Sequence, residues 1–280
     1  METENKIFVQ NKGLKRDITD KYYTKNEVVE LCKNEIIKHI EIKKNDYIIE
    51  PSAGNGSFIN IIKELTNNYY FYDIMPENND IIKQDFLTFD YKKLKVNNNK
   101  IHIIGNPPFG RQSSLAIQFI KKCCKFADTI SFILPKSFKK DSNKSKFNLY
   151  YHLEFEIDLP ANSFTVNNTD CDVPCIFQIW IKKNIPRIKP DKLEPLNFIF
   201  VNKEEKHDIS FRRVGVYAGN IDKNTENKSF QSHYFIKFKN NKTVDENINL
   251  LKKINFVFNN TVGPKSISKQ ELIKEFNKYI

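Results

Sequence analysis

The 280-residue sequence predicts an α/β domain built on a mostly parallel β-sheet. Short apolar segments that are typical of buried strands alternate with helical segments along the first two thirds of the chain. Two glycine-containing turns directly follow such strands, as ligand-binding turns do in open α/β sheets. The last two strands of this region have no helix between them. We therefore expect them to pair as an antiparallel hairpin at the end of the sheet.

The elements of this domain follow one another closely. The sequence Thr24-Lys25-Asn26-Glu27 has the pattern of a capping box, and apolar residues then recur at helical spacing to Ile40, which predicts a helix. The remaining predicted elements, in chain order, are a strand over 46–50, a turn over 51–56, a helix over 57–65, a strand over 69–74, a short strand or turn over 81–85, a strand over 100–104, a helix over 113–127, and strands over 129–134, 150–159 and 173–181.

The composition of the sequence changes near residue 186. Prolines and lysines between Ile185 and Pro195 predict a connector. We therefore expect two domains, residues 1–185 with a loose N-terminus over 1–20, and a small α+β domain over 186–280. In the second we expect strands over 197–201, 209–217 and 233–238, and helices over 244–254 and 268–279.

Composition limits the class of protein. Apolar residues make up 40% of the chain, which is enough for a buried core and excludes collagen-like, mucin-like and wholly disordered proteins. No apolar run approaches the ~18 residues of a membrane span, and the charged start of the chain is not a secretory signal. We expect an intracellular protein, cytoplasmic or nuclear, with no membrane partner.

Cysteine and histidine usage argues against disulfides and metal. Five cysteines are an odd number, and neither they nor the five histidines have the spacing of metal ligands. We therefore expect no metal site.

The net charge of +11 favours a polyanionic partner such as nucleic acid, because neutralising phosphates releases counterions. However, only five of the 45 basic residues are arginines. Lysine, asparagine and isoleucine are all encoded by A/T-rich codons, so an A/T-rich genome, as in a parasite, a symbiont or a large virus, explains much of this composition.

The first glycine-containing turn is typical of a nucleotide-like cofactor site. The chain has only eight glycines, and Gly54 and Gly56 fall in Glu50-Pro51-Ser52-Ala53-Gly54-Asn55-Gly56, between a strand and a helix. Scarce glycines at strand ends indicate positive φ or close approach of a ligand to the main chain. Asp73 ends the next strand, where an acid can accept hydrogen bonds from ribose hydroxyls.

The second turn, Gly105-Asn106-Pro107-Pro108-Phe109-Gly110, also follows a strand. Two prolines fix φ and remove backbone donors. The Asn106 side-chain oxygen and the Pro107 carbonyl can then face one planar –NH₂ group, and Phe109 offers a face on which a base can stack. Asn106, Pro107, Pro108 and Phe109 are the candidate catalytic residues.

With these motifs the sequence resembles the S-adenosylmethionine-dependent adenine-N6 methyltransferases in which the cofactor motif precedes an Asn-Pro-Pro-Phe or Asn-Pro-Pro-Tyr motif. EPSAGNGSF, YDIMP, QDF and NPPF occur in the family's order over roughly residues 20–183. The resemblance implies a class I, Rossmann-like methyltransferase sheet of seven strands with the last pair antiparallel. It also implies S-adenosylmethionine as the cofactor.

The resemblance implies roles for individual residues. Tyr22, Tyr23 and Thr24 would lie beside the methionine end of the cofactor. Asp85 would accept a hydrogen bond from the adenine amino group of the cofactor. The full set implied to bind the cofactor is Tyr23, Thr24, Glu50, Pro51, Ala53, Gly54, Gly56, Asp73, Ile74, Asp85, Phe86 and Asn106, with Ile74 beside the adenine and Phe86 packed on its ring.

The expected substrate is an adenine flipped out of its stack. Phe109 and Phe164 would sandwich the base, while Asn106 and Pro107 hold its amine. Arg111, Lys136, and Arg212 with Arg213 in the C-terminal piece are candidate nucleic-acid contacts. Lys139, Lys140, Lys144 and Lys146 extend the basic stretch that begins at Lys136.

Several substrates fit these motifs. DNA is the expected nucleic acid, with RNA as the main alternative and the side-chain amide of a protein glutamine as a second, since that amide is also a planar –NH₂. A non-catalytic binding subunit on this fold disagrees with the intact motifs. Cytosine-N4 enzymes usually have Ser where Asn106 stands. The recognition sequence, the oligomeric state and a nuclease partner stay open.

Overall fold

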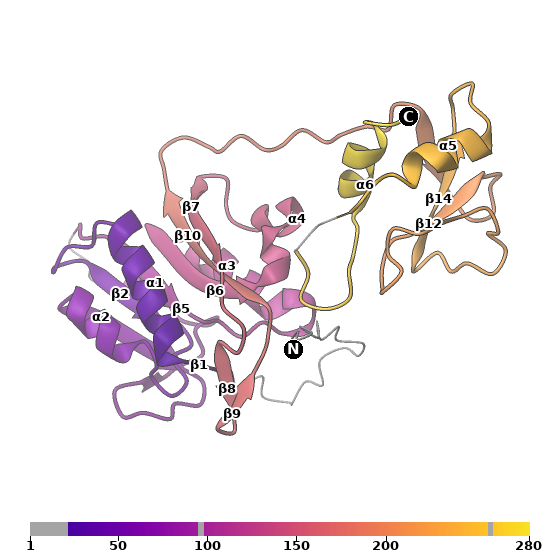
Figure 1. Ribbon diagram of the computed structural model, residues 1–280. Coiled ribbons are helices and arrows are strands. Elements are labelled where there is room, and N and C mark those ends of the chain that lie inside the picture. The colour runs from indigo at the N-terminus through magenta and orange to yellow at the C-terminus, as the bar shows by residue number, and fades with distance from the viewer. Residues whose placement is uncertain (1–21, 95–97, 257–259) are drawn as a thin grey trace, which may run out of the picture. The chain divides into compact units, whose positions relative to one another are not determined.

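The computed structural model describes residues 22–94, 98–256 and 260–280 (Figure 1). The contacts within the chain divide it between Lys189 and Pro190. We call residues 22–189 the N-terminal unit and Pro190–Ile280 the C-terminal unit. Each unit is described by itself.

The N-terminal unit is built on a seven-stranded sheet in the order β4-β3-β2-β5-β6-β10-β7. Its strands are β2 (Tyr47–Glu50), β3 (Asn68–Asp73), β4 (Ile82–Lys83), β5 (Ile101–Gly105), β6 (Thr129–Pro135), β7 (Tyr151–Asp158) and β10 (Cys175–Lys182). Neighbours from β4 to β6 pair in parallel, and β10 pairs antiparallel with both β6 and β7. The predicted α/β class and the antiparallel last pair are therefore confirmed, and so is the count of seven strands.

The strand order places a topological switch point at the centre of the sheet. From β2 the chain moves outward through β3 to β4, and then returns to the other side of β2 to form β5. In open α/β sheets the loops that leave two such strands diverge at their carboxyl ends and leave room for a ligand. The two glycine-containing turns follow β2 and β5, so the topology brings both predicted motifs to this point.

Helices pack on the sheet and complete a core. They are α1 (Asn26–His39), α2 (Ile59–Leu65) and α3 (Ser114–Cys123), and the short α4 (Asp141–Lys144), which has no buried residue, follows β6. Figure 1 shows α1 and α2 side by side against the sheet. The core is apolar and aromatic, with Phe132, Phe147 and Trp180 buried in it. None of the described helices has the length and apolar character needed to cross a membrane.

A separate three-stranded sheet was not predicted. It joins β1 (Tyr23–Thr24), β8 (Phe164–Val166) and β9 (Thr169–Cys171) in the order β1-β8-β9. The hairpin between β8 and β9 turns at Asn167 and Asn168, which both have positive φ, as a tight two-residue hairpin requires. The Asn-Asn pair between short apolar segments was the sequence signal for it.

The predicted capping box at Thr24 is wrong. Helix α1 begins at Asn26 after Lys25, and no side chain caps it. Thr24 instead lies in β1, opposite Phe164 of β8. Pairing with β8 keeps Thr24 extended, and its hydroxyl is used elsewhere, as described below.

The C-terminal unit is a four-stranded antiparallel sheet with two helices. The strands run in the order β11-β14-β12-β13. Their bounds are β11 (Phe198–Val201), β12 (Ile209–Arg212), β13 (Ile221–Asp222) and β14 (His233–Phe238), followed by α5 (Val244–Leu251) and α6 (Lys269–Phe276). The strand predicted over 209–217 ends at Arg212, and β13 was missed.

The division between the units lies four residues beyond the boundary expected from the sequence. The physical reason is Arg187. Its guanidinium donates hydrogen bonds to four main-chain carbonyls of the N-terminal unit and lies 5.3 Å from the centre of the Trp180 ring. The first part of the connector is therefore fastened to the N-terminal unit.

Candidate active site

The turn after β2 is held open by its glycines and fixed by hydrogen bonds to β3. Gly54 and Gly56 have φ of 56° and 91°, as the sequence predicted for glycines at strand ends. The Ala53 amide donates to the Tyr72 carbonyl at 2.8 Å, and the Gly54 amide donates to Asp73 Oδ2 at 2.8 Å. Pro51 and Ala53 are buried beneath the turn. The main chain of the turn is thereby presented at the carboxyl end of the sheet.

The Asp73 carboxylate accepts hydrogen bonds from the turn after β2 and from the segment after β3. Besides the bond from Gly54, its Oδ1 accepts a hydrogen bond from the Met75 amide at 2.8 Å. A carboxylate oxygen has two lone pairs, so each oxygen keeps capacity for a further donor. Ile74, the next residue, is 61% exposed. An acid with spare acceptors beside an exposed apolar side chain is what a ribose and an adjoining base require.

Glu50 is a buried carboxyl group without a partner for one oxygen. Its side chain is 2% exposed, and Oε2 has no hydrogen-bond partner among the described residues. Burial raises the pKa of Glu50 well above its ordinary value, and the charge of Asp73 raises it further. A buried acceptor without a hydrogen-bond partner costs folding free energy. Its presence at the switch point therefore indicates that a ligand supplies the donor.

Gly105 makes room for Glu50 at the end of β5. Its φ is 152°, and a Cβ atom there would lie 3.2 Å from Glu50 Cγ. Gly105 therefore allows the carboxyl group of β2 and the motif that follows β5 to lie against each other.

Asn106 is fixed on one side of its amide and open on the other. Its Nδ2 donates to Thr24 Oγ1 at 3.3 Å, while its buried Oδ1 has no partner among the described residues. Its main-chain carbonyl accepts a hydrogen bond from Ser52 Oγ at 3.3 Å. The contact with Thr24 orients the amide so that the oxygen is the free end, available to a donor.

The rest of the Asn-Pro-Pro-Phe motif is a rigid turn attached to α3. Pro107 is buried, whereas Pro108 and Phe109 are half-buried. The Phe109 carbonyl accepts hydrogen bonds from the Leu115 and Ala116 amides at 3.2 and 3.4 Å. Phe109 packs partly against the core of the N-terminal unit and keeps part of its ring exposed. The motif therefore has a fixed backbone and a partly exposed aromatic ring.

Residues of β1 close over the first turn. The Tyr23 hydroxyl donates to the Glu77 carboxylate at 2.8 Å, and a Cβ atom on Gly54 would lie 3.9 Å from the Tyr23 ring. The structure thus brings Tyr23, Thr24, Glu50, Gly54, Asp73 and Asn106 into one connected site. Ser52 and Glu77 were not predicted. Only their neighbourhood to the motifs could have indicated them.

Two predicted residues lie in the core instead. Phe86 is 1% exposed and stacks on Phe119 at a centroid distance of 5.5 Å. Phe164 is 1% exposed on β8, and Tyr22 meets it edge-on at 6.3 Å. Neither ring presents an open face, so we leave Phe86 out of the cofactor site and Phe164 out of the base site. Asp85 is exposed, and its Oδ1 accepts from the Leu87 amide at 2.9 Å.

Lys136, Lys139 and Lys144 of the predicted basic stretch each pair with an acid. Lys136 and Lys139 both pair with Asp158 of β7, at 3.6 and 2.8 Å. Lys144 pairs with Glu156 at 3.0 Å. These acids lie on the neighbouring strand, a pairing that the linear sequence did not reveal. Arg111 is exposed directly beyond the motif and is the better candidate for a phosphate contact.

The two arginines of the C-terminal unit have different surroundings. Arg212 donates through Nε to the Val214 carbonyl at 2.8 Å, a local turn contact. Arg213 donates to the Gln231 carbonyl and lies 5.4 Å from the centre of the Tyr234 ring, at the edge of a pocket. Only Arg213 therefore lines an open site.

Comparison with known proteins agrees with this geometry. Residues 41–172 match the model of the EDM2 methyltransferase-like domain. The chain is 27% identical over 205 residues to ribosomal RNA small subunit methyltransferase A of Francisella tularensis subsp. tularensis, covering 64% of this chain and 74% of that one. To the protein of the same name in F. tularensis subsp. novicida it is 30% identical over 115 residues, covering 36% and 44%.

The matched segment contains both turns at the switch point of a class I sheet. The chain is an S-adenosylmethionine-dependent methyltransferase.

Two of the solved structures that align with this chain are described as methyltransferases. One from Listeria monocytogenes, assigned to the class I S-adenosylmethionine-dependent methyltransferases, aligns with a TM-score of 0.46 and 15% identity, covering 63% of this methyltransferase and 65% of that chain. One from Pyrococcus horikoshii, assigned as an RNA methyltransferase, aligns with a TM-score of 0.45 and 14% identity, covering 61% and 92%.

The residues present fit S-adenosylmethionine, the cofactor of this methyltransferase. The orphaned Oε2 of Glu50 offers an acceptor. The Gly54 turn leaves room beside the main chain, and Asp73 and Ile74 offer an acid and an apolar surface. Glu50 and the Gly54 turn would hold the amino acid of the cofactor, Asp73 would hold its ribose, and Ile74 would contact its base. Asn106 would lie toward the reacting end.

Proposed function

We propose that this methyltransferase methylates the N6 amino group of an adenine in RNA. The observation that carries the proposal is Asn106, whose buried Oδ1 has no hydrogen-bond partner in the described part of the chain while Thr24 holds the other end of its amide. A buried acceptor in this state favours a substrate that brings an N–H donor.

The Asn-Pro-Pro-Phe turn suits a planar amine on an aromatic base. Pro107 and Pro108 have no amide N–H, so the turn presents acceptors without a competing donor. The Asn106 Oδ1 and the Pro107 carbonyl would each accept one hydrogen of the amine. The exposed part of Phe109 would stack on the base, which must leave its own stack to arrive there.

The bound cofactor supplies an electrophilic methyl group on a positively charged sulfur. The chain's own residues orient the amine and stabilise the positive charge that develops on its nitrogen. The two acceptors do this by electrostatic preorganisation, since Thr24 and the turn fix them before substrate binds. The proton leaves the methylated amine to solvent, so a strong base is not needed.

RNA is proposed over DNA because curated relatives that match 64% of this chain are named as ribosomal RNA methyltransferases. The motifs alone led us to expect DNA, which uses the same adenine amine. DNA is therefore the second candidate, and a protein glutamine amide is the third.

The test is methyl transfer by the purified full-length chain from labelled S-adenosylmethionine. Single-stranded and duplex RNA, the matching DNA and a glutamine-containing peptide are offered in parallel, with nucleoside mass spectrometry of the products. We expect N6-methyladenosine in RNA. Label only in N6-methyldeoxyadenosine would move the assignment to DNA, and label only in peptide would overturn a nucleic-acid substrate.

The catalytic role of Asn106 has its own test. Asn106→Ala should lower kcat by about 100-fold or more, as the loss of a preorganised electrostatic group does, and should keep cofactor affinity within about threefold. Asn60→Ala, an exposed asparagine of α2, is the matched control. Full activity of Asn106→Ala would refute the proposed mechanism.

A further inference from the structure

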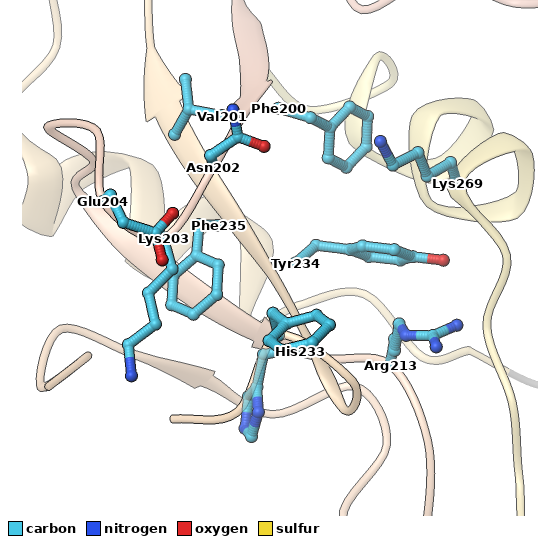
Figure 2. A pocket seen from close by; sticks show the side chains of 11 residues that line it. Phe200, Val201, Asn202, Lys203, Glu204, Arg213, His233, Tyr234, Phe235 and Lys269 are labelled. Carbon is cyan, nitrogen blue, oxygen red and sulfur yellow. The ribbon is translucent and has the colours of Figure 1, made fainter. Parts of the chain in front are cut away.

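A pocket of about 490 Å³ in the C-terminal unit is not explained by the methyl-transfer site. It lies where β11, β14 and the start of α6 meet (Figure 2). Its walls combine the aromatic rings of Phe200, Phe230 and Tyr234 with the cationic side chains of Lys203, Arg213 and Lys269. Aromatic faces and cations in one pocket are the two features that hold a nucleotide in single-stranded nucleic acid.

The cations are arranged around the rings. Lys269 Nζ lies 4.6 Å from the centre of the Phe200 ring and 5.9 Å from that of Tyr234. Arg213 lies 5.4 Å from the centre of the Tyr234 ring, and Figure 2 shows it on the opposite side of that ring from Lys269. A nucleotide in the pocket would therefore have cations within reach of its phosphate.

These cations are not neutralised by the protein. Within the part of the chain that the structure describes, Lys203, Arg213 and Lys269 have no carboxylate within ion-pair distance, and Glu204 is the one acid among the lining residues. Residues 190–280 also carry 16 basic against 11 acidic side chains, so about half of the net charge of +11 lies on a third of the chain. The pocket is therefore suited to an anion.

Phe230 is unusual because its ring is largely in water. It is 71% exposed, although phenylalanine is normally buried, and it borders the pocket. An exposed aromatic ring next to unpaired cations is a ready stacking surface. An acidic peptide would engage the cations but would leave such a ring without a partner.

We propose that this pocket holds one unstacked nucleotide of the nucleic-acid substrate. The base stacks on the exposed ring of Phe230, and its phosphate is paired by Arg213 and Lys269. The inference rests on the proposed function for the class of substrate, and it adds a second nucleotide site, separate in sequence from the catalytic motif. Because stacking is sequence-tolerant, this site supplies affinity for single strands rather than a recognition sequence.

The test is direct binding by the full-length chain, with S-adenosylhomocysteine present so that no turnover occurs. The probe is a short fluorescein-labelled single-stranded RNA, compared with the same strand in a duplex and with the matching DNA. Phe230→Ala should weaken single-strand binding by about fivefold or more, the loss of one stacked base. Tyr217→Ala, equally exposed at 69% and outside the pocket, is the control.

The phosphate contacts are tested by salt dependence. Arg213→Gln and Lys269→Gln should each lower the slope of log affinity against log salt by about 0.7, as expected for one lost contact to a single strand. Lys274→Gln, on the same helix as Lys269, should leave the slope unchanged.

Three results would overturn the proposal. The first is that Phe230→Ala binds as tightly as its control. The second is that duplex binds as well as single strand. The third is that an acidic peptide displaces the probe from the Phe230→Ala variant and from the unmodified chain with equal efficiency. Since binding is read without methylation, a chain that binds as expected but methylates neither RNA nor DNA would contradict the proposed function alone.

Discussion

The Thr24 hydroxyl orients the side-chain amide of Asn106. It holds Asn106 Nδ2 and so leaves Oδ1 as the free end of the amide. We expect Thr24→Val to lower kcat by about threefold to tenfold without weakening cofactor binding, because the amide is then free to rotate. Thr24→Ser keeps the hydroxyl and should restore most of the rate.

Steady-state kinetics and calorimetric titration of S-adenosylmethionine measure these two quantities. If Thr24→Val lowered kcat and Thr24→Ser failed to restore it, the hydroxyl would not be the positioning group.

Glu50 should make the stability of the cofactor-free protein depend on pH. Its pKa is raised in the folded chain, so the folded state binds more protons than the unfolded state from about the ordinary value of 4.5 up to the raised value. Stability therefore falls as pH rises through that window. Glu50→Gln removes the ionisation, so without cofactor it should melt at a higher temperature than the unmodified protein at pH 8.

Melting curves at pH 5 and pH 8 check this, and the two proteins should differ less at pH 5. Glu41→Gln, an exposed acid, is the control. Greater stability of the unmodified protein at pH 8 would mean that the carboxylate has a partner when charged. With cofactor, Glu50→Gln should bind S-adenosylmethionine more weakly, by about tenfold, since charge-assisted hydrogen bonds are lost.

At the scale of elements, Arg187 fastens the connector to the loop between α4 and β7. Its guanidinium donates four hydrogen bonds, to the carbonyls of Lys144, Phe147, Asn148 and Tyr151, and so ties the connector to that loop and to the elements on either side of it. Arg187→Ala should cost about 2 kcal/mol and lower the melting temperature by about 5 °C.

Arg187→Lys should recover only part of this loss, because an ammonium cannot match the fork of a guanidinium. Circular dichroism melting measures both variants. An unchanged melting temperature for Arg187→Ala would show that water replaces the guanidinium without cost.

The main strands and helices were predictable because their signals are local. Apolar runs bounded by turns located β2, β5 and β6, and His233–Phe238 was predicted with its observed bounds. Features that depend on residues far away in the chain were not predictable. Thr24 pairs with Phe164 and does not cap the helix, and the strands of the hairpin at Asn167-Asn168 are too short to show strand periodicity.

The site follows the same division. Gly54, Gly56, Asp73 and the Asn-Pro-Pro-Phe turn could be located from sequence because each depends on the backbone conformation at a strand end. The burial of Phe86 and Phe164 could not be predicted, because it depends on residues far away in the chain. The neutralisation of Lys136 by Asp158 was equally invisible.

At the scale of the whole molecule, each unit has a core of its own. The core of the N-terminal unit surrounds Phe132 and Trp180, and that of the C-terminal unit surrounds Phe211 and Phe276. We therefore expect residues 1–189 to fold alone, to bind S-adenosylmethionine within about threefold of the full chain, and to lose at least about tenfold in affinity for single-stranded RNA.

Calorimetry and the fluorescent RNA probe measure these two affinities. A fragment that kept full RNA affinity would assign substrate binding to the N-terminal unit. A fragment that failed to fold would show that the two cores depend on each other.

The contact between Thr24 and Asn106 also sets an order of events during synthesis. Thr24 is held extended by β8, whose hairpin closes only after Asn168 has been made. A nascent chain arrested before that point contains the complete Asn-Pro-Pro-Phe motif, yet it lacks the strand that positions the partner of the catalytic amide. The site is therefore finished late, by a segment that carries none of its chemistry.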